Sequence, residues 1–263
     1  MAAEGRTTAD PPSHQGCAIS SVRLRPPAQR GELRDRHEDG HRLHHLLWRL
    51  GPGVRVCSSA VLGGGIGTRA WILNAQVPGG YPRLDPDRHL AEIAAAEGLT
   101  GPGAGLMTAA DVTAYTSGQD GGVTATVTAG LGVRGWAAAP DTATRAPGLP
   151  EAEASAAQLA PGPAEVPVSP FRPGTVNIVV TLPVALSDAA LVNAVATATE
   201  AKVQALLDAG LDCSGTPTDA VCVAAPQPGP DGGEPFAGPR SPWGARIARA
   251  VHTAVLAGAR TAP

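Results

Sequence analysis

Aromatic residues are scarce in this chain, where phenylalanine, tyrosine and tryptophan together make up 3% of 263 residues. The core must therefore be built from alanine, valine and leucine, which an overall hydrophobic content of 43% allows. Strong charge of either sign is also missing, because the formal net charge is −3 at pH 7. This balance gives no electrostatic reason to expect nucleic acid or an anionic membrane as a partner.

Long apolar runs and paired cysteines are absent as well. No run reaches the ~18 residues that a membrane-spanning helix needs, and the N-terminus lacks the apolar core of a signal peptide. The four cysteines, Cys17, Cys57, Cys213 and Cys222, are far apart and form no CxxC pair. We therefore expect a cytoplasmic protein with reduced thiols and no zinc site.

Two stretches are too rich in proline and small or polar residues to form a core. Such compositions cannot bury enough apolar area to offset the entropy of ordering the chain. We predict a disordered, low-complexity N-terminal segment at residues 1–45 and a disordered insert at about residues 138–173. One folded domain is expected between residues 46 and 260, interrupted by this insert.

Four histidines, at positions 37, 41, 44 and 45, lie close together near the end of the N-terminal segment. Histidines four residues apart on one helix can share a metal ion. No set of cysteines or carboxylates accompanies these four, however, and a polar cluster before a Leu-Leu-Trp strand is commonly surface. We therefore predict no metal site here.

The clearest secondary-structure pattern runs from Gly174 to Pro226. Thr175–Leu182 is β-branched and apolar, which predicts a buried strand. Ser187 is a suitable N-cap for an alanine-rich helix that ends near Gly210. A tight loop at residues 214–219 then leads into a second apolar strand, Ala220–Ala225. This pattern predicts a strand–helix–strand unit.

The two faces of that helix are expected to differ. Helical spacing places Val192, Val195, Val203 and Leu206 on one face, which is predicted to pack. Polar residues at 193, 197, 200 and 204 line up about a third of a turn away. We therefore expect a polar site along this second face.

Further strands and a second long helix complete the predicted domain. Val54–Leu62 and Thr68–Val77 are joined by a glycine loop, and we predict a hairpin rather than a nucleotide-binding loop, because the latter should lead into a helix. Val123–Thr128 alternates and predicts a half-buried strand with a threonine face. With helices near 188–209 and 242–257, the sequence predicts an α+β fold: a single domain with a mixed β-sheet packed against long helices.

Three longer motifs occur in order between residues 197 and 251: TATEAKVQAL, SGTPTDAV and AGPRSPWGARIARAV. In these motifs the chain resembles the adenosylcobinamide amidohydrolase (CbiZ) family of corrinoid salvage. The resemblance runs from about Leu46 to Ala257, apart from the insert, and includes the strings Asn74–Pro78 and Leu106–Val112.

This resemblance implies a reaction and a substrate. The family cleaves the amide that joins aminopropanol to a propionate side chain of the corrin ring, which converts adenosylcobinamide to adenosylcobyric acid in cobalamin biosynthesis. The expected partner is therefore a small-molecule corrinoid. The cobalt belongs to that substrate, and no cofactor of the protein itself is expected.

Amide hydrolysis requires an activated nucleophile, a polarised carbonyl and a proton for the leaving amine. We predict that Glu200 and Asp219 form an acid–base pair, with Thr216 as an oxyanion donor or as the nucleophile. The substrate-binding residues are expected among polar and glycine positions of the matched segments: Ser58, Ser59, Gly64, Asn74, Asn193, Thr197, Gly215, Thr218, Arg240 and Ser241.

Plainer interpretations of these residues remain open. Glu200 is also typical of a solvent-exposed helix position, and Asp219 is also a suitable turn cap. Two other functions fit the same motifs: a non-catalytic corrinoid-binding module, and an amidase for another bulky amide. Release of aminopropanol distinguishes the enzyme from the binding module.

Overall fold

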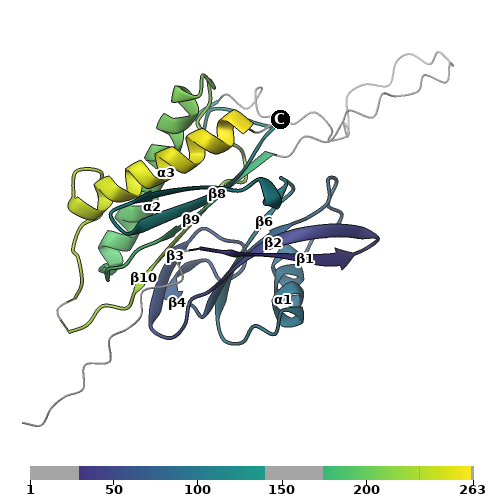
Figure 1. Ribbon diagram of the computed structural model, residues 1–263, viewed down its shortest axis with the longest axis horizontal. Coiled ribbons are helices and arrows are strands. Elements are labelled where there is room, and N and C mark those ends of the chain that lie inside the picture. Colours follow the sequence, from purple (N-terminus) through teal and green to yellow (C-terminus); the bar gives the residue numbers. More distant parts are fainter. Residues whose placement is uncertain (1–29, 140–173, 231, 262–263) are drawn as a thin grey trace, which may run out of the picture.

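The computed structural model describes residues 30–139, 174–230 and 232–261. Two β-sheets lie face to face in this part of the chain, with helices on both outer sides (Figure 1). The elements, in chain order, are β1 (Glu32–Glu38), β2 (His41–Arg49), β3 (Val54–Ser58), β4 (Gly65–Thr68), β5 (Trp71–Gln76), α1 (Pro86–Ala96), β6 (Gly103–Thr108), the short 3-10 helix η1 (Val112–Ala114), β7 (Thr116–Asp120), β8 (Val123–Leu131), β9 (Gly174–Thr181), α2 (Asp188–Asp208), β10 (Ala220–Pro226) and α3 (Pro242–Thr261).

Both sheets are mixed. The six-stranded sheet has the order β4-β3-β10-β9-β8-β7, and its only parallel pair is β9 with β10. The four-stranded sheet has the order β1-β2-β5-β6, with β5 and β6 parallel. The predicted α+β fold with a mixed sheet packed against long helices is confirmed, with two sheets in place of one.

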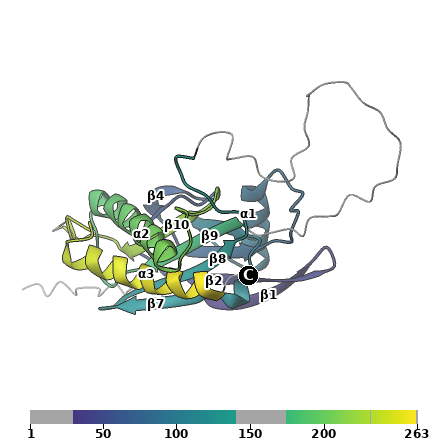
Figure 2. The ribbon, with the colours of Figure 1, turned by 90° about the horizontal axis from the view of Figure 1, so that it is seen from above.

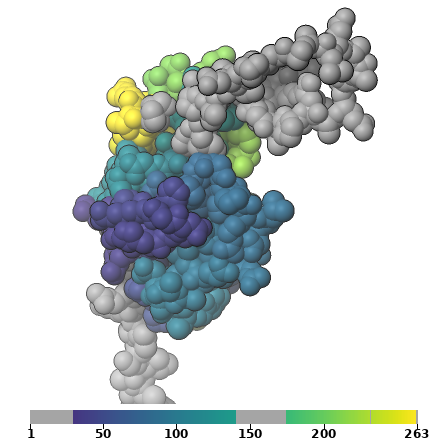
Figure 3. Space-filling view, turned by 90° about the vertical axis from the view of Figure 1, so that its right-hand side faces the viewer, coloured from purple at the N-terminus to yellow at the C-terminus, as the bar shows by residue number. Residues whose placement is uncertain are grey.

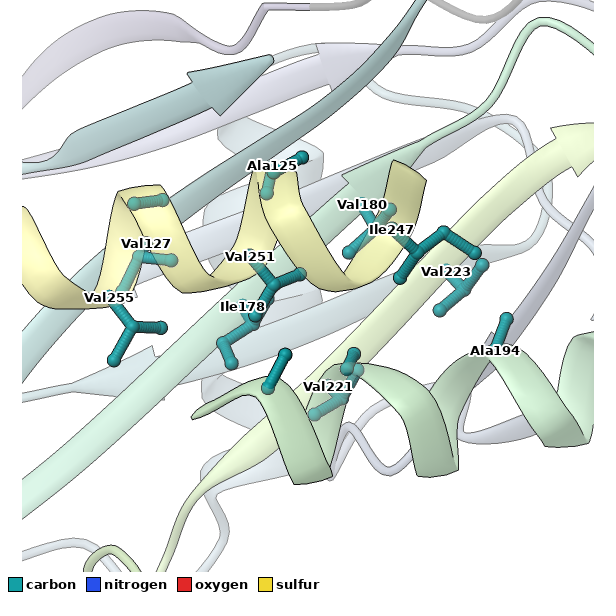
Figure 4. Packing of buried hydrophobic residues seen from close by; sticks show 14 of the residues in the cluster. Ala125, Val127, Ile178, Val180, Ala194, Val221, Val223, Ile247, Val251 and Val255 are labelled. Atoms are coloured by element: carbon teal, nitrogen blue, oxygen red, sulfur yellow. The ribbon is translucent and has the colours of Figure 1, made fainter. Parts of the chain in front are cut away.

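The largest core lies between the six-stranded sheet and helices α2 and α3. Alternate residues of β8, β9 and β10 point to the helices, where they meet Ile247, Val251 and Val255 of α3 (Figure 4). Helix α2 contributes mainly alanines, such as Ala194, whose small side chains let the helix approach the strands closely. The two helices lie side by side on this layer (Figure 2), where His252 Nε2 of α3 is 2.8 Å from Asp208 Oδ2 of α2.

A second core fills the space between the sheets. Leu46, Trp48 and Ile72 of the four-stranded sheet pack there against Val179 and Cys222 of the six-stranded sheet. A third cluster joins the other face of the four-stranded sheet to α1 through residues such as Leu47, Leu73 and Leu90. The molecule is thus a stack of four layers: α2 with α3, the six-stranded sheet, the four-stranded sheet, and α1.

The packed face of α2 was predicted only in part, because Leu206 of the expected face is buried and Val192 is not. Its buried residues include Ala194, Ala198, Ala205 and Leu206, whereas Val192 is 54% exposed. Alanine occurs all around this helix, so the branched residues alone did not indicate which side meets the sheet. The side of α2 that carries most of the buried alanines packs on the sheet, because small side chains let the helix lie close to the strands.

The predicted hairpin between Val54–Leu62 and Thr68–Val77 was also wrong. β3 pairs with the short strand β4 inside the glycine loop, and β5 belongs to the other sheet. The chain leaves the first sheet at Arg69 and Ala70, where Ala70 donates a backbone hydrogen bond to Pro102. The sequence between Val54 and Val77 therefore does not show where the chain passes from one sheet to the other.

Part of the predicted N-terminal disordered segment is folded. β1 and the first half of β2 lie within residues 1–45 and form an antiparallel hairpin that is visible on the surface in Figure 3. Its strand β1 is an edge strand with largely exposed side chains, so it lacks the alternation that marks a half-buried strand. Residues 1–29 and almost all of the predicted insert at 138–173 lie outside the described residues.

The histidines are spread over this hairpin. His37 and His41 are exposed, whereas His45 is buried with its Nε2 3.2 Å from a carboxylate oxygen of Glu97. Burial lowers the pKa of His45, and the nearby Glu97 opposes that effect. In the part of the chain that the structure describes, no group of three or more His, Cys, Asp or Glu residues is placed to hold a metal ion. None of the described helices is long and apolar enough to cross a membrane.

Stability is expected to be insensitive to reductant. Cys57, Cys213 and Cys222 are free thiols. Cys57 packs on the helix side of the six-stranded sheet and Cys222 on its other side, so these neighbours cannot form a disulfide without rearrangement. Burial raises the pKa of the Cys222 thiol to about 12, which keeps it unreactive. Thermal melting with and without dithiothreitol should give the same midpoint, and a large decrease with reductant would contradict this assignment.

Candidate active site

The carboxylate of Asp219 is the centre of a buried polar cluster. Asp219 ends the tight loop before β10 and accepts hydrogen bonds from the backbone of Val176 (2.8 Å), the backbone of Thr216 (3.1 Å) and the Thr216 hydroxyl (2.5 Å). The ammonium of Lys202, on α2, pairs with its second oxygen, Oδ2. The side chains of Lys202 and Asp219 are only 9% and 11% exposed. The cluster therefore holds a carboxylate, a hydroxyl and an ammonium within contact of one another.

Gly215 makes room for this cluster. Its φ of +149° lies in a region that residues with a side chain rarely adopt. A Cβ at this position would overlap Asp219 Oδ2 and would lie 2.6 Å from Lys202 Nζ. Two backbone hydrogen bonds hold the loop in place: Ser214 donates to the Gly135 carbonyl, and Gly135 donates to the Gly215 carbonyl. Glycine is thus required where the chain passes the ion pair.

The expected pair of Glu200 and Asp219 does not form. Glu200 is exposed, and Lys202 is the α2 residue that contacts Asp219. Two residues along a helix correspond to a rotation of about 200°, so a side chain at 200 points away from one at 202. The prediction therefore selected the correct part of the helix but the wrong residue.

Other predicted residues do gather at this end of the sheet. Thr218 Oγ1 lies 2.5 Å from Thr175 Oγ1 and 3.0 Å from the Gly174 carbonyl, to which it donates. Ser59 Oγ accepts from the backbone of Val221 at 3.1 Å, which extends the pairing of β3 with β10. Ser58 Oγ accepts from the backbone of Ala60 at 3.0 Å. These hydroxyls border the cluster, and each already has a partner in the protein.

Asn74 links the two sheets near the same end. Its Nδ2 donates to Thr128 Oγ1 at 3.0 Å, and its Oδ1 accepts from Asn177 Nδ2 at 2.8 Å. Asn177 also donates to the backbone carbonyl of Met107 at 3.0 Å. Because all these groups are buried or partly buried, the bridge fixes the end of β5 against the six-stranded sheet.

Four predicted site residues are separated from Asp219. Asn193 is exposed, and the hydroxyl of Thr197 donates to the carbonyl of Ala237 at 2.7 Å. Ser241 caps α3, where its Oγ accepts from the backbone of Gly244 at 3.1 Å, and Arg240 beside it is exposed.

The direction of α3 explains the separation. Its first turns lie against Gly121, next to the start of β8, whereas its last turn at Gly258 lies against Ala129 near the end of β8. The start of β9 pairs with the end of β8, and Asp219 contacts the start of β9. Arg240 and Ser241 are therefore at the opposite end of the sheet from the cluster.

Two cavities adjoin the sheets. One of about 450 Å³ lies between the glycine loop, Trp71 and α1, and Arg69 closes the loop by donating to the carbonyls of Gly63 and Gly64. The loop's Gly64 is crowded, because a Cβ there would lie 2.6 Å from the Ala60 carbonyl. Gly64 thus serves a tight turn next to Ser58.

The second cavity, of about 290 Å³, lies at the same end of the six-stranded sheet as Asp219. It is bordered by the end of β8, the end of α3, Gln76 and Asp111, and most of its other lining residues are alanine or glycine. Asp111 caps η1, since its Oδ1 accepts from the backbone of Thr113 at 2.9 Å. The Asp111 carboxylate therefore serves as the cap of η1.

Sequence reasoning missed Lys202, although a signal was present. Lys202 follows Ala198 by four residues and precedes Leu206 by four, and both neighbours are fully buried. A lysine on the packed stripe of a helix requires a partner, because an unpaired buried charge is costly. The spacing could thus have indicated a buried ion pair with a nearby carboxylate.

Comparison with known proteins agrees with the motifs. The family described as adenosylcobinamide amidohydrolase (CbiZ) matches residues 30–262, which includes the N-terminal hairpin. A Methanosarcina mazei protein named adenosylcobinamide amidohydrolase is 30% identical over 207 residues, covering 76% of this chain and 88% of the relative. A Halobacterium salinarum protein of the same name is 42% identical over 120 residues, covering 41% of this chain and 49% of the relative. The chain belongs to the adenosylcobinamide amidohydrolase family, whose members are hydrolases acting on an amide bond.

Proposed function

We propose that this protein hydrolyses the aminopropanol amide of adenosylcobinamide, giving adenosylcobyric acid and 1-amino-2-propanol, as a step of cobinamide salvage for cobalamin biosynthesis. The observation that carries this proposal is the family match over residues 30–262. Free, largely buried thiols suit a cytoplasmic location for the reaction. The cobalt belongs to the corrinoid substrate.

The Asp219 cluster supplies the groups that such a reaction needs. The Thr216 hydroxyl already donates to Asp219 Oδ1 at 2.5 Å, so its proton has an acceptor as the oxygen attacks a carbonyl. We assign Thr216 as the nucleophile and Asp219 as its general base. The backbone donor of Val176 and the Lys202 ammonium hold the carboxylate in the orientation that this transfer requires.

The corrinoid is expected to lie across the open end of the sheet rather than in an enclosed pocket. The two cavities, of about 450 Å³ and 290 Å³, have volumes typical of sites for drug-sized ligands. A corrinoid is much larger than such ligands. The cavity beside Gln76 and Asp111 is at the same end as the cluster and is suited to one peripheral side chain of the ring. Thr218, which contacts the start of β9, lies on the side of the cluster that faces β8 and this cavity.

The test is the release of 1-amino-2-propanol by the purified protein. Adenosylcobinamide should be converted to equal amounts of the amine and adenosylcobyric acid, and N-(2-hydroxypropyl)propionamide, which lacks the ring, should react far more slowly. Tight corrinoid binding without amine release would favour the binding-module alternative. Equal rates on both amides would favour a general amidase.

A further inference from the structure

We infer that Lys202 is the general acid of the reaction, the group that gives a proton to the leaving amine nitrogen. This inference rests on the proposed function and assigns the role for which Glu200 was first expected. It depends on three observations: where the ammonium lies, how many of its hydrogen bonds are used, and what the leaving group requires.

The position of the ammonium comes first. Lys202 and Thr216 bind the two oxygens of one carboxylate, with the Thr216 hydroxyl on Oδ1 and the ammonium on Oδ2. The backbone of Thr216 also donates to Oδ2, at 3.1 Å. The ammonium and the hydroxyl are therefore held by the two oxygens of one carboxylate, and we place the departing nitrogen of a carbonyl attached to Thr216 Oγ1 on the side of the ammonium.

The unused hydrogen bonds come second. A lysine ammonium carries three N–H groups. Among the described residues, Asp219 is the single hydrogen-bond partner of Lys202, although the side chain is only 9% exposed. Gly215 lies directly against Nζ, since a Cβ there would be 2.6 Å from it, so the loop passes close to the ammonium. Two of its N–H groups thus have no partner in the part of the chain that the structure describes.

The chemistry of the leaving group comes third. An alkylamine cannot depart as an anion, so its nitrogen must be protonated as the C–N bond breaks. By then Asp219 holds the Thr216 proton and lies against the Lys202 ammonium, so the carboxyl and the ammonium are the two donors at this point. Among the described residues, Lys202 is the charged donor in contact with this carboxylate, and we assign it the proton transfer to nitrogen.

The proton transfers balance around one cycle. The Thr216 proton passes to Asp219 as the Oγ1–C bond forms, and a Lys202 proton passes to nitrogen as the C–N bond breaks. This leaves neutral Lys202 against protonated Asp219, and a proton moves between them to restore the ion pair. Water then attacks the Thr216 ester, with Asp219 accepting the water proton and returning it to Oγ1. The sum is amide plus water giving acid plus amine.

A purely structural role for Lys202, as counter-ion of Asp219, is distinguished by replacing it with arginine. Arginine keeps the positive charge and the pairing with a carboxylate, but its guanidinium does not give up a proton in proteins. Lys202→Arg should therefore preserve the ion pair and remove the acid. A counter-ion role would leave turnover nearly unchanged in this variant.

The experiment compares two leaving groups on folded protein. Lys202→Arg should lower the turnover of adenosylcobinamide by ~10²–10⁴-fold. First-turnover release of 4-nitrophenolate from the 4-nitrophenyl ester of adenosylcobyric acid, which needs no acid, should stay within about threefold of wild type. Lys202→Met provides a second variant with the same expected split. Ala196→Met, an exposed position on the same helix, should leave both substrates unaffected.

Two results would overturn the inference: full amide turnover by Lys202→Arg, or equal losses on the amide and the ester in both Lys202 variants. Melting curves recorded for each variant ensure that the comparison is made on folded protein. If wild-type protein releases no amine, the proposed function fails instead, and this failure is visible before any variant is made.

Discussion

Asp219→Asn should lower the turnover of adenosylcobinamide by ~10²–10⁴-fold, because an amide oxygen cannot take the Thr216 proton. The variant should also be less stable. Its amide preserves the shape of the side chain but leaves the buried Lys202 charge without a counter-ion, which costs about 3–5 kcal/mol in typical buried pairs. Steady-state kinetics and thermal melting of the same sample measure the two effects.

A double variant separates these effects. In Asp219→Asn combined with Lys202→Met, no buried charge is left unpaired, and replacing both members of a buried pair is often neutral. Stability should therefore return toward that of wild type, while turnover stays low. Recovery of turnover together with stability would show that Asp219 has no chemical role and that the single variant failed only through folding.

Gly215→Ala should have the second large effect, on both stability and turnover. The new Cβ would overlap Asp219 Oδ2 and approach Lys202 Nζ at 2.6 Å, and the φ of +149° is strained for alanine. Strained backbone alone costs about 1–3 kcal/mol, and displacement of the ion pair adds to that. At roughly 2–4 °C per kcal/mol, the melting midpoint should fall by about 5–12 °C.

Gly135 provides the matched control for this substitution. It lies on the neighbouring segment and donates a backbone hydrogen bond to Gly215. A Cβ at Gly135 meets nothing within 4 Å, so Gly135→Ala should change melting and turnover little. If Gly215→Ala behaves like Gly135→Ala, the loop has room to adjust and the crowding around Asp219 is not important for function.

The sequence predicted well those elements whose pattern depends on their own residues. β8 alternates in sequence, β9 and β10 are short apolar runs, and α2 has a clear N-cap at Ser187; the observed bounds of these elements agree with the prediction to within a few residues. Asp219 was selected because it opens a buried strand within the family-like motif SGTPTDAV, and the structure places four donors around its carboxylate.

What failed depends on tertiary contacts. Nothing local in the run around Arg69 and Ala70 indicates that β4 and β5 belong to different sheets. The exposed side chains of β1 lack a core-facing pattern because the strand is at an edge. Lys202 was passed over for Glu200 because the alanine-rich helix hides its packed side. Arg240 was placed in the site from its motif alone, and the direction of α3 puts it at the other end.

The most direct test of the account is the fate of oxygen during turnover in water labelled with the heavy oxygen isotope. Hydrolysis at the amide carbonyl predicts adenosylcobyric acid carrying one labelled oxygen in its new carboxylate, with an equal amount of unlabelled 1-amino-2-propanol. Adenosylcobyric acid without label, or corrinoid binding with neither product formed, would contradict the account.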